Sequence, residues 1–234
     1  MKRLCTICVR AGSKGVPNKN IRFLAGRPLL VYTLEQAKET QLFDAVAVSS
    51  DGSNILNVAT QFGADFAIGR PPSLASDDAP KLPAIRHCVE MVESEVGTEF
   101  DIIVDLDATS PLRSKQDIVG AVRLLENEGV DNVITGSTAR RSPYFNMVEL
   151  DPDDGSVQLV KTPGHTISRR QDAPKCFDMN ASIYVWKRSA LFSNKSLFGE
   201  STRLFEMPEE RSLDIDSQLD FEIVEFLMNR NAKR

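Results

Sequence analysis

The chain has 234 residues, 41% of them hydrophobic, and a formal net charge of -5 at pH 7, so it can form one sizeable core and we expect a single domain over residues 1–234. The acidic balance argues against general binding to nucleic acid or to an anionic membrane. No apolar stretch approaches the roughly 20 residues that span a bilayer, and the first apolar run is too short for a signal peptide, so we expect a cytoplasmic protein.

Cysteine and histidine usage gives little support for a metal site built from these residues. The chain has four cysteines and two histidines. Cys5 and Cys8 have the C-x-x-C spacing, but residues three apart on a strand point to opposite faces, and no second pair follows. We therefore expect buried cysteines that pack in the core, without disulfides in a reducing compartment.

The first part of the chain alternates short apolar runs with amphipathic segments. Strands that alternate with helices at this spacing predict right-handed β-α-β crossovers and a mostly parallel sheet in an α/β fold. The Ser50-Asp51 pair has the residue types of a helix N-cap. We expect strands at residues 4–9, 44–49 and 64–68, and helices at residues 28–39, around 55–62 and at 81–96.

The second part continues this pattern and then departs from it. Residues 100–106 are the clearest buried strand, and Ser114 with Asp117 predicts a capping box for a helix to residue 128. After a strand at 131–137, strand-like segments on either side of a turn at 151–155 predict a hairpin. We assign this hairpin to an inserted β arm at residues 139–179, which needs a partner to cover it because an isolated hairpin is marginal in water.

The loop after the first strand has the composition of a phosphate site. Glycines let the backbone approach a ligand, and a loop at the carboxyl end of a parallel strand lies where open α/β sheets bind ligands. The spacing matches neither a Walker loop nor the dinucleotide fingerprint, and a glycine-rich surface turn with solvated lysines is the structural alternative. The glycines and cations of this loop are Arg10, Gly12, Lys14, Gly15 and Lys19.

Two later loops follow strands of the same sheet and should line the same cleft. The first, residues 69–78, is rich in proline and contains Arg70 and Ser76. Its final Ser-Asp-Asp can equally cap the helix that follows. The second loop comes directly after the buried strand and begins with the polar run 107–110.

A carboxylate pair lies near the other end of the chain, in the segment 212–217. In an extended segment residues two apart point to one side, so Asp214 and Asp216 present both carboxylates to the same space. Like charges so placed repel unless a cation joins them, and Mg²⁺ suits one or two carboxylates together with phosphate oxygens. Ser217 and Asp220 also predict a capping box, but that alternative leaves Asp214 unexplained.

Four segments, in this order, resemble the signatures of one enzyme family, the CMP-sialic acid synthetases or acylneuraminate cytidylyltransferases. The resemblance covers nearly the whole chain. It implies a three-layer Rossmann-like nucleotidyltransferase fold, transfer of CMP from CTP to a nine-carbon sugar acid, Mg²⁺ as cofactor, and a homodimer formed through the arm. The segments are Arg-x-Gly-Ser-Lys-Gly-x-x-x-Lys-Asn at 10–20, Arg-Pro-x-x-Leu-Ala-x-Asp at 70–77, Thr-Ser-Pro-Leu-Arg at 109–113 and Asp-Ile-Asp-x-x-x-Asp-Phe at 214–221.

The same resemblance implies roles for individual residues, and metal binding falls to Asp214 and Asp216. The residues implied in catalysis are Arg10, Lys19 and Asp216. The residues implied in nucleotide binding are Arg10, Ala11, Gly12, Ser13, Lys14, Gly15, Lys19, Asn20, Arg70 and Ser76. The residues implied in sugar binding are Asp107, Thr109, Ser110, Arg170 and Asn180.

Three places depart from the family's pattern. Asp107-Ala108 stands where the family has Gln-Pro, Asp178 where arginine is usual, and Ala181-Ser182 where Gly-Ala is usual. The family places these positions on the sugar side of the cleft, so the resemblance implies an acceptor other than plain N-acetylneuraminate, such as legionaminate, pseudaminate or a 3-deoxy-octulosonate. From other classes, a non-catalytic nucleotide-binding module stays open, while a Rossmann oxidoreductase lacks its glycine fingerprint.

Overall fold

A mostly parallel sheet forms the middle of the protein, as predicted. The computed structural model describes residues 1–12, 15–76, 78–162 and 169–231, in which seven strands pair in the order β11-β7-β10-β6-β1-β4-β5. Within this sheet β10 runs antiparallel to its neighbours β6 and β7. The strands are β1 (Arg3–Cys8), β4 (Ala45–Ser50), β5 (Phe66–Gly69), β6 (Ile102–Leu106), β7 (Asn132–Thr138), β10 (Phe177–Lys187) and β11 (Thr202–Glu206).

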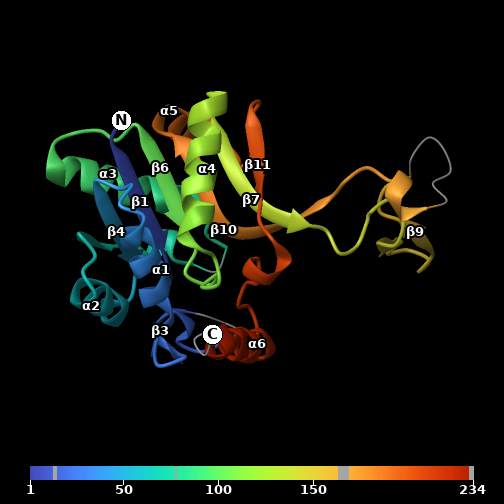
Figure 1. Cartoon of the computed structure of the whole chain (residues 1–234), viewed down its shortest axis with the longest axis horizontal. Helices are drawn as coiled ribbons and strands as arrows, with labels where there is room; N and C mark the ends of the chain where they lie inside the picture. Colours follow the sequence, from blue (N-terminus) through green and yellow to red (C-terminus); the bar gives the residue numbers. More distant parts are fainter. Residues whose placement is uncertain (13–14, 77, 163–168, 232–234) are drawn as a thin grey trace.

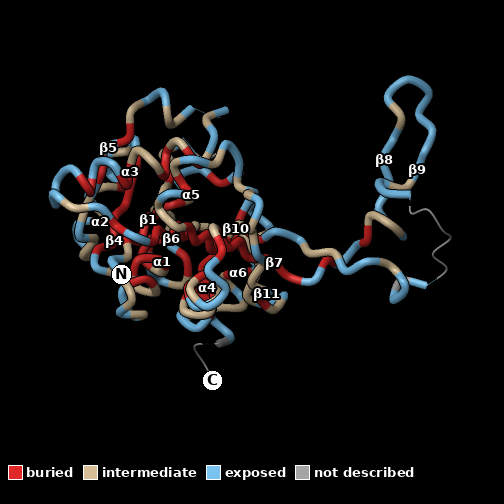
Figure 2. The backbone as a smooth tube through the Cα atoms, turned by 90° about the horizontal axis from the view of Figure 1, so that it is seen from above, coloured by how far each residue is buried: buried red, intermediate tan, exposed pale blue. Residues whose placement is uncertain are grey.

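Helices cover both faces of the sheet and complete a three-layer arrangement (Figure 1). Helices α1 (Leu29–Glu39), α2 (Ser53–Gln61) and α4 (Lys115–Glu128) share a hydrophobic core with one face. Helices α3 (Lys81–Val96) and α5 (Arg188–Ser193) pack against the other face. Buried positions therefore run through the middle of the body, along the strands (Figure 2).

The predicted helix ends are partly right. The capping box of α4 is confirmed, because Ser114 Oγ accepts a hydrogen bond from Asp117 N and Asp117 Oδ2 accepts one from Ser114 N at 2.8 Å. The predicted cap at Ser50-Asp51 is wrong: β4 continues through Ser50, and Gly52 is the N-cap of α2. Asp51 instead accepts a hydrogen bond from the first loop.

Helix α3 has the predicted bounds but a different start. Its N-cap is Pro80, with no side-chain capping hydrogen bond, so the predicted cap by Ser76 and Asp78 does not form. Asp77, the third residue of that prediction, lies outside the described residues. Lys81 is thus the first helical residue, and no side chain of the preceding described residues caps the helix.

Several elements were not predicted from the sequence. Strand β10 returns through the sheet from the arm, and β11 pairs in parallel with β7 at the edge. Edge strands are half solvated, so β11, Thr-Arg-Leu-Phe-Glu, lacks a recognisable apolar run. The small elements are β2 (Phe23–Leu24), β3 (Arg27–Pro28) and the 3₁₀ helices η1 (Lys19–Ile21), η2 (Pro72–Leu74), η3 (Arg170–Asp172) and η4 (Glu209–Arg211).

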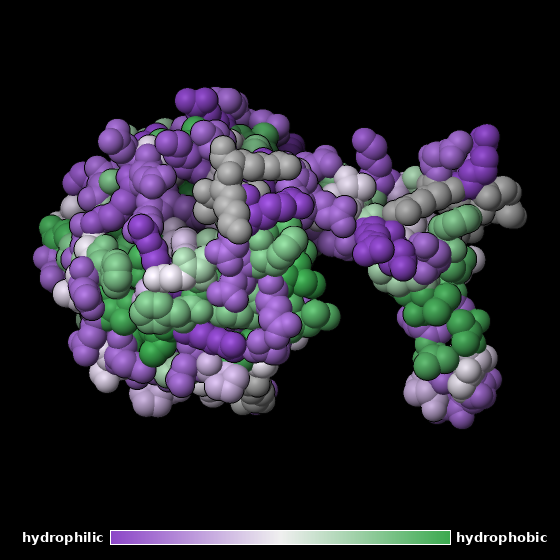
Figure 3. Space-filling view, turned by 60° about the horizontal axis from the view of Figure 1, so that its bottom comes forward, coloured by the Kyte–Doolittle hydropathy of each residue, from purple (hydrophilic) through white to green (hydrophobic). Residues whose placement is uncertain are grey.

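The predicted hairpin is present and projects from the body. Strands β8 (Val148–Leu150) and β9 (Val157–Leu159) pair antiparallel in a sheet of their own. They lie at the end of an arm that extends away from the central sheet (Figures 1 and 2). Hydrophobic side chains gather on this arm in the space-filling view (Figure 3).

The two ends of the chain pack together in a third hydrophobic cluster. Val16 of the first loop and Leu24 share this cluster with Phe221 and Val224 of α6 (Gln218–Asn231). The predicted capping box at the start of α6 is confirmed, with Asp220 N donating to Ser217 Oγ at 3.2 Å and Ser217 N to Asp220 Oδ2 at 2.7 Å. Three apolar residues of α6 are nevertheless exposed: Leu219, Ile223 and Phe226.

Cys5 and Cys8 lie on opposite faces of the sheet, as expected. Cys5 belongs to the core on the α1 face, and Cys8 packs against the core on the α3 face. Both are free thiols, as are Cys88 and Cys176. Separately, none of the helices in the described part of the chain combines the length and the apolar character needed to cross a membrane.

Candidate active site

A cavity of about 450 Å³ opens beside the ends of β1 and β6, where the loops were expected to converge. Parallel strands end at the same edge of a sheet, so the loops that follow them line one space. Ser13 and Lys14 lie outside the described residues. The predicted site residues that line the cavity are Arg10, Gly15, Lys19, Asn20, Arg70, Ser76, Asp107, Thr109 and Asp216.

The first loop is fixed at both of its described ends. Ala11 N donates a hydrogen bond to Asp51 Oδ1 at 2.8 Å, and Asn20 Nδ2 donates to Arg10 O at 2.9 Å. Asn20 is buried, so its side-chain amide holds the loop from the interior of the protein. These contacts hold the Arg10 backbone at the cavity wall, where its guanidinium also donates to Ser76 O at 3.4 Å.

Lys19 and the carboxylate segment meet in the cavity, although 197 residues separate Lys19 from Asp216. Lys19 Nζ donates a hydrogen bond to Ile215 O and lies 3.4 Å from Asp216 Oδ1. The Lys19 side chain is 13% exposed and that of Asp216 is 81% exposed. A largely enclosed cation and an open carboxylate therefore face the same cavity, an arrangement that suits a metal-bound phosphate.

Asp214 lies deeper than Asp216. Burial raises the pKa of its carboxyl, and the nearby charge of Asp107 adds to the rise. Its Oδ1 is buried without a hydrogen-bond partner among the described residues. A buried carboxylate oxygen without a donor is costly unless a cation or a ligand compensates it. The segment itself is fixed by Ile215, whose N donates to Thr109 O at 3.0 Å.

Arg70 and Ser76, from the loop that follows β5, also line the cavity. Arg70 is buried, and its guanidinium donates to Ser49 Oγ at 3.3 Å and to Ser49 O at 3.0 Å. Ser49 is the penultimate residue of β4, so the strand end holds the arginine in place. A fixed guanidinium in the wall provides planar donors for a nucleoside or phosphate group.

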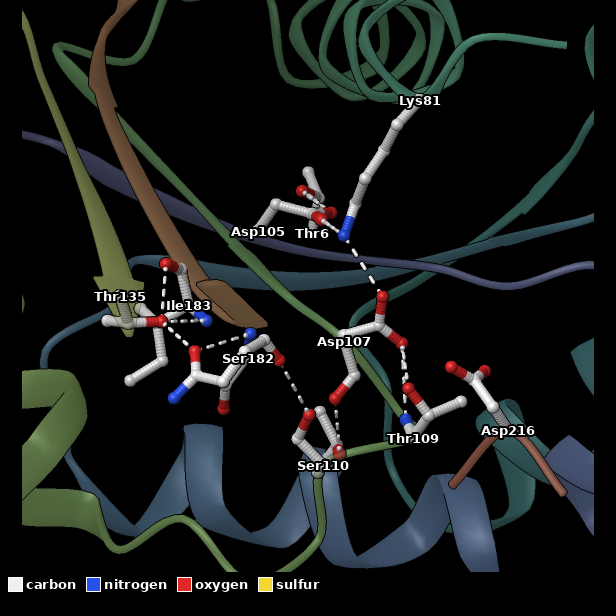
Figure 4. Close-up of polar contacts among 12 residues, drawn as sticks. Thr6, Lys81, Asp105, Asp107, Thr109, Ser110, Thr135, Ser182, Ile183 and Asp216 are labelled. Carbon is white, nitrogen blue, oxygen red and sulfur yellow. Dashed lines mark hydrogen bonds and ion pairs between the residues drawn. The ribbon is translucent and has the colours of Figure 1, made fainter. Parts of the chain in front are cut away.

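Asp107 and Thr109 form the wall next to the sheet centre. Asp107 Oδ1 accepts hydrogen bonds from Thr109 N at 3.1 Å and from Thr109 Oγ1 at 2.9 Å. Lys81 Nζ lies 3.0 Å from the other oxygen, Oδ2. Burial alone would raise the pKa of Asp107, but Lys81 and the hydrogen bonds from Thr109 lower it to about 2. The carboxylate is therefore ionised and held at both oxygens (Figure 4).

The structure does not bring every predicted site residue to the cavity. Ser110 and Asn180 are buried, and neither lines the cavity. Asn180 Oδ1 accepts from Thr135 Oγ1 at 2.7 Å, and its Nδ2 donates to Ser212 Oγ at 3.0 Å. These contacts link strands and loops inside the protein, so the Asn180 side chain has a structural role.

The remaining predicted positions are also outside the wall. Arg170 begins η3 in the segment that carries the arm, and its side chain lies outside the described part of the structure. Apart from its chain neighbours, none of the described residues has a heavy atom within 4 Å of the point that a Cβ would occupy at Gly12. The cavity lining does not include three further positions: Ala11, Gly12 and Asp214.

Comparison with known proteins gives the family. Residues 4–230 match the sequence family described as cytidylyltransferase. The chain belongs to the cytidylyltransferase family. A CMP-N,N'-diacetyllegionaminic acid synthase of Campylobacter jejuni is 45% identical to it, over 97% of this chain and 94% of the relative. An N-acylneuraminate cytidylyltransferase of Streptococcus agalactiae is 31% identical, over 94% of this chain and 52% of the relative. The family relationship implied by the four signatures is thereby confirmed.

The fold of this cytidylyltransferase also recurs among solved structures. A CMP:2-keto-3-deoxy-manno-octonic acid synthetase, solved as a complex with CTP, superimposes with a TM-score of 0.71. The alignment covers 99% of this chain and 100% of that one, at 18% identity. At that identity the likeness supports the shared three-layer fold and nothing finer.

Three residues of this cytidylyltransferase site were missed by sequence reasoning. Arg113 is buried and donates to Asp107 O at 2.6 Å and to Ser182 O at 2.7 Å, so it shapes the loop that carries Asp107. Asp105 and Lys81 form an ion pair of 3.1 Å beneath the cavity. A lysine at the first position of a helix is unfavourable for the helix dipole, and that local conflict was the available signal for Lys81.

Proposed function

We propose that this cytidylyltransferase transfers CMP from CTP to a sialic-acid-like nonulosonate, a nine-carbon sugar acid, and releases pyrophosphate. The observation that carries the proposal is the convergence of Lys19 and Asp216 on one cavity with Arg10. Cations from the first loop and a carboxylate from the far end of the chain are the groups that a metal-bound triphosphate requires. The names of the two relatives support a sugar acid as acceptor.

In this reaction the anomeric hydroxyl of the sugar attacks the α-phosphorus in line. A new P–O bond forms, the bond to the β-phosphate breaks, pyrophosphate leaves, and the hydroxyl proton passes to solvent or a nearby base. Phosphoryl transfer needs mainly positioning and charge neutralisation. Arg10 and Lys19 neutralise phosphate charge, while Asn20, Arg70 and Ser76 lie toward the nucleoside.

The carboxylate pair fits Mg²⁺. Asp214 has a buried oxygen without a partner among the described residues, and the Asp216 side chain is open to the cavity. Within the described ranges no group of three or more His, Cys, Asp or Glu side chains is placed to hold a metal ion. Mg²⁺ commonly takes one or two carboxylates together with phosphate oxygens and water, and when bound it would neutralise phosphate charge.

The acceptor side is assigned to the wall formed by Asp107 and Thr109. Among the candidate acceptors, the legionaminate type is favoured by the 45% identity with the legionaminate synthase of Campylobacter jejuni. Plain N-acetylneuraminate, pseudaminate and a 3-deoxy-octulosonate are the alternatives to be compared in the same assay.

We also assign a homodimer, formed through the arm. Val148, Leu150 and Val157 on its hairpin are each more than half exposed, at 57%, 68% and 61%. A two-stranded hairpin with exposed apolar residues requires a covering partner, and a second copy of the chain related by a two-fold axis provides one.

The decisive experiment measures pyrophosphate release from CTP with each sugar acid, with Mg²⁺ and after its removal by EDTA. We expect turnover with Mg²⁺, highest for the legionaminate type, and loss of turnover with EDTA. If CTP binds in a Mg²⁺-dependent way but no acceptor gives pyrophosphate, the protein is a non-catalytic nucleotide-binding module and the proposal is wrong.

A further inference from the structure

Lys81 occupies a position in the cavity wall that no sequence motif assigns. Its side chain extends from the start of α3 to the sheet, where Nζ lies 3.1 Å from Asp105 Oδ2 and 3.0 Å from Asp107 Oδ2 (Figure 4). The same ammonium lies 4.5 Å from the ring centroid of Tyr184. A cation at a helix N-terminus opposes the helix dipole. The interactions that favour a lysine at this position are therefore those with the two carboxylates, and not those with the helix.

The two carboxylates differ in their surroundings. Asp105 is fully buried in β6, and its other oxygen accepts a hydrogen bond from Thr6 Oγ1 at 2.8 Å. The Asp107 side chain is 25% exposed and faces the cavity. Burial would lower the pKa of Lys81, but Asp107 and Asp105 outweigh burial and raise it, so the lysine stays charged.

Two protein carboxylates already flank the Lys81 ammonium in the cavity wall. A lysine ammonium has three N–H bonds. One of them donates to Asp107 Oδ2 at 3.0 Å, while the ammonium also forms an ion pair with Asp105 at 3.1 Å and lies over the Tyr184 ring. We therefore expect Lys81 to act on a substrate through Asp107, the group that it holds at the cavity surface.

Asp107 is restricted by these contacts both in orientation and in chemistry. Lys81 fixes one carboxylate oxygen, and Thr109 fixes the other through N and Oγ1. An ionised carboxylate can only accept hydrogen bonds, whereas a glutamine at this position could both donate and accept. A sugar group that meets Asp107 must therefore bring an O–H or N–H, and a carboxylate or carbonyl at that point is repelled.

We propose that Lys81 is a specificity-determining positioning residue: by holding Asp107 charged and in one orientation, it selects a sugar acid that presents an O–H or N–H to Asp107 and directs its carboxylate elsewhere. This inference rests on the proposed function. It identifies the acceptor by its hydrogen-bonding pattern, which a neutral residue at position 107 would not impose.

The test compares wild type, Lys81→Met, Lys81→Arg and Asp107→Gln. The acceptors are matched pairs of sugar acids in which one hydroxyl or acylamido N–H is methylated. We expect Lys81→Met to lower kcat/KM for the acceptor by on the order of 10²-fold, because a displaced positioning group costs about that much. KM for CTP should change by less than about threefold, since Arg10 and Lys19 remain, and Lys81→Arg should recover part of the loss.

Asp107→Gln keeps the Lys81–Asp105 ion pair, so it provides the answer even if Lys81→Met fails to fold. We expect it to narrow the preference for the unmethylated acceptor of each pair. Arg188→Met is the matched control, because Arg188 pairs with Glu93 at 2.8 Å and does not line the cavity. It should lower the Tm without changing the order of acceptors.

Three results would overturn the inference. They are unchanged acceptor kinetics in Lys81→Met, an equal loss of CTP and acceptor binding, and an unchanged order of acceptors in Asp107→Gln. The wild-type measurement in the same assay keeps the two proposals separate. No turnover of wild type with any acceptor contradicts the proposed function, whereas normal turnover with unaltered selectivity in the variants contradicts only the role of Lys81.

Discussion

Lys19 is the cation that contacts both the carboxylate segment and the cavity. Charge that develops on the phosphate during transfer is stabilised by a fixed cation beside it. We expect Lys19→Ala to lower kcat, with CTP saturating, by on the order of 10²-fold, as for other preorganised charge stabilisers. The effect on KM for CTP should be smaller because Arg10 remains. Steady-state pyrophosphate release measures both constants.

Lys195 supplies the control for this variant. It is exposed on the surface and is not part of the cavity wall. Lys195→Ala should turn over at the wild-type rate. If Lys19→Ala also keeps near-normal kcat at saturating CTP, the lysine has no part in the chemical step.

At single positions, sequence reasoning predicted which charged residues line the cavity better than it predicted where polar side chains point. Arg10, Lys19 and Asp216 were found because cations, glycines and paired carboxylates at loop positions have few structural uses. Ser110 and Asn180 were implied in sugar binding by the resemblance, yet their side chains serve the interior. Hydrogen-bond partners from distant strands decide between these two outcomes, and one sequence contains no record of them.

Gly15 lies where the first loop packs closely against the carboxylate segment. A Cβ at this position would lie 1.9 Å from Asp216 O, a backbone atom that cannot rotate aside. Gly15→Ala must therefore displace the loop or the segment. We expect a loss of about 1–3 kcal/mol, as in other overpacked sites, and about 2–4 °C in Tm for each kcal/mol in a chain of this size. Differential scanning calorimetry measures the shift.

Gly12→Ala is the matched comparison in the same loop. In the part of the chain that the structure describes, no heavy atom beyond its chain neighbours lies within 4 Å of the position of a Cβ there, and the φ of Gly12 is outside the left-handed range. Its Tm should stay at the wild-type value. Equal Tm values for Gly15→Ala and wild type would contradict the close approach of the loop to Asp216.

For helices and strands, local sequence signals gave correct predictions where no distant contact competed with them. The box of Ser114 and Asp117 was predictable because both partners lie within four residues. The cap at Ser50-Asp51 failed because parallel pairing with β5 extends β4 through Ser50, and tertiary pairing overrides a local preference. Strands β10 and β11 were missed for a related reason, since each is defined mainly by the neighbours with which it pairs.

In the whole molecule, distant segments are joined by packing that no local motif specifies. Val16 and Ile215 are both fully buried in one cluster with α6, which places the first loop against the carboxylate segment. The expected meeting of these segments came from chemistry, because a metal-bound triphosphate needs both. The hydrophobic cluster that enforces it was not predicted.

The hairpin at the end of the arm has one apolar face that is uncovered in the single chain. In the hairpin register Val148 pairs with Leu159 and Leu150 with Val157, so these side chains share one face. Glu149 pairs with Gln158 on the other face, where their side chains are hydrogen-bonded at 3.3 Å.

Because Leu150 is 68% exposed, replacing it should not unfold a single chain, whereas a charge would be buried without a partner in a dimer. We expect Leu150→Asp to raise the dimer dissociation constant at least about 100-fold, or about 2.7 kcal/mol. Gln158→Asp places the same residue on the polar face and should leave the dimer intact. Light scattering across a dilution series measures both variants, and a wild-type chain that stays monomeric at every concentration would remove the dimer and leave the apolar face unexplained.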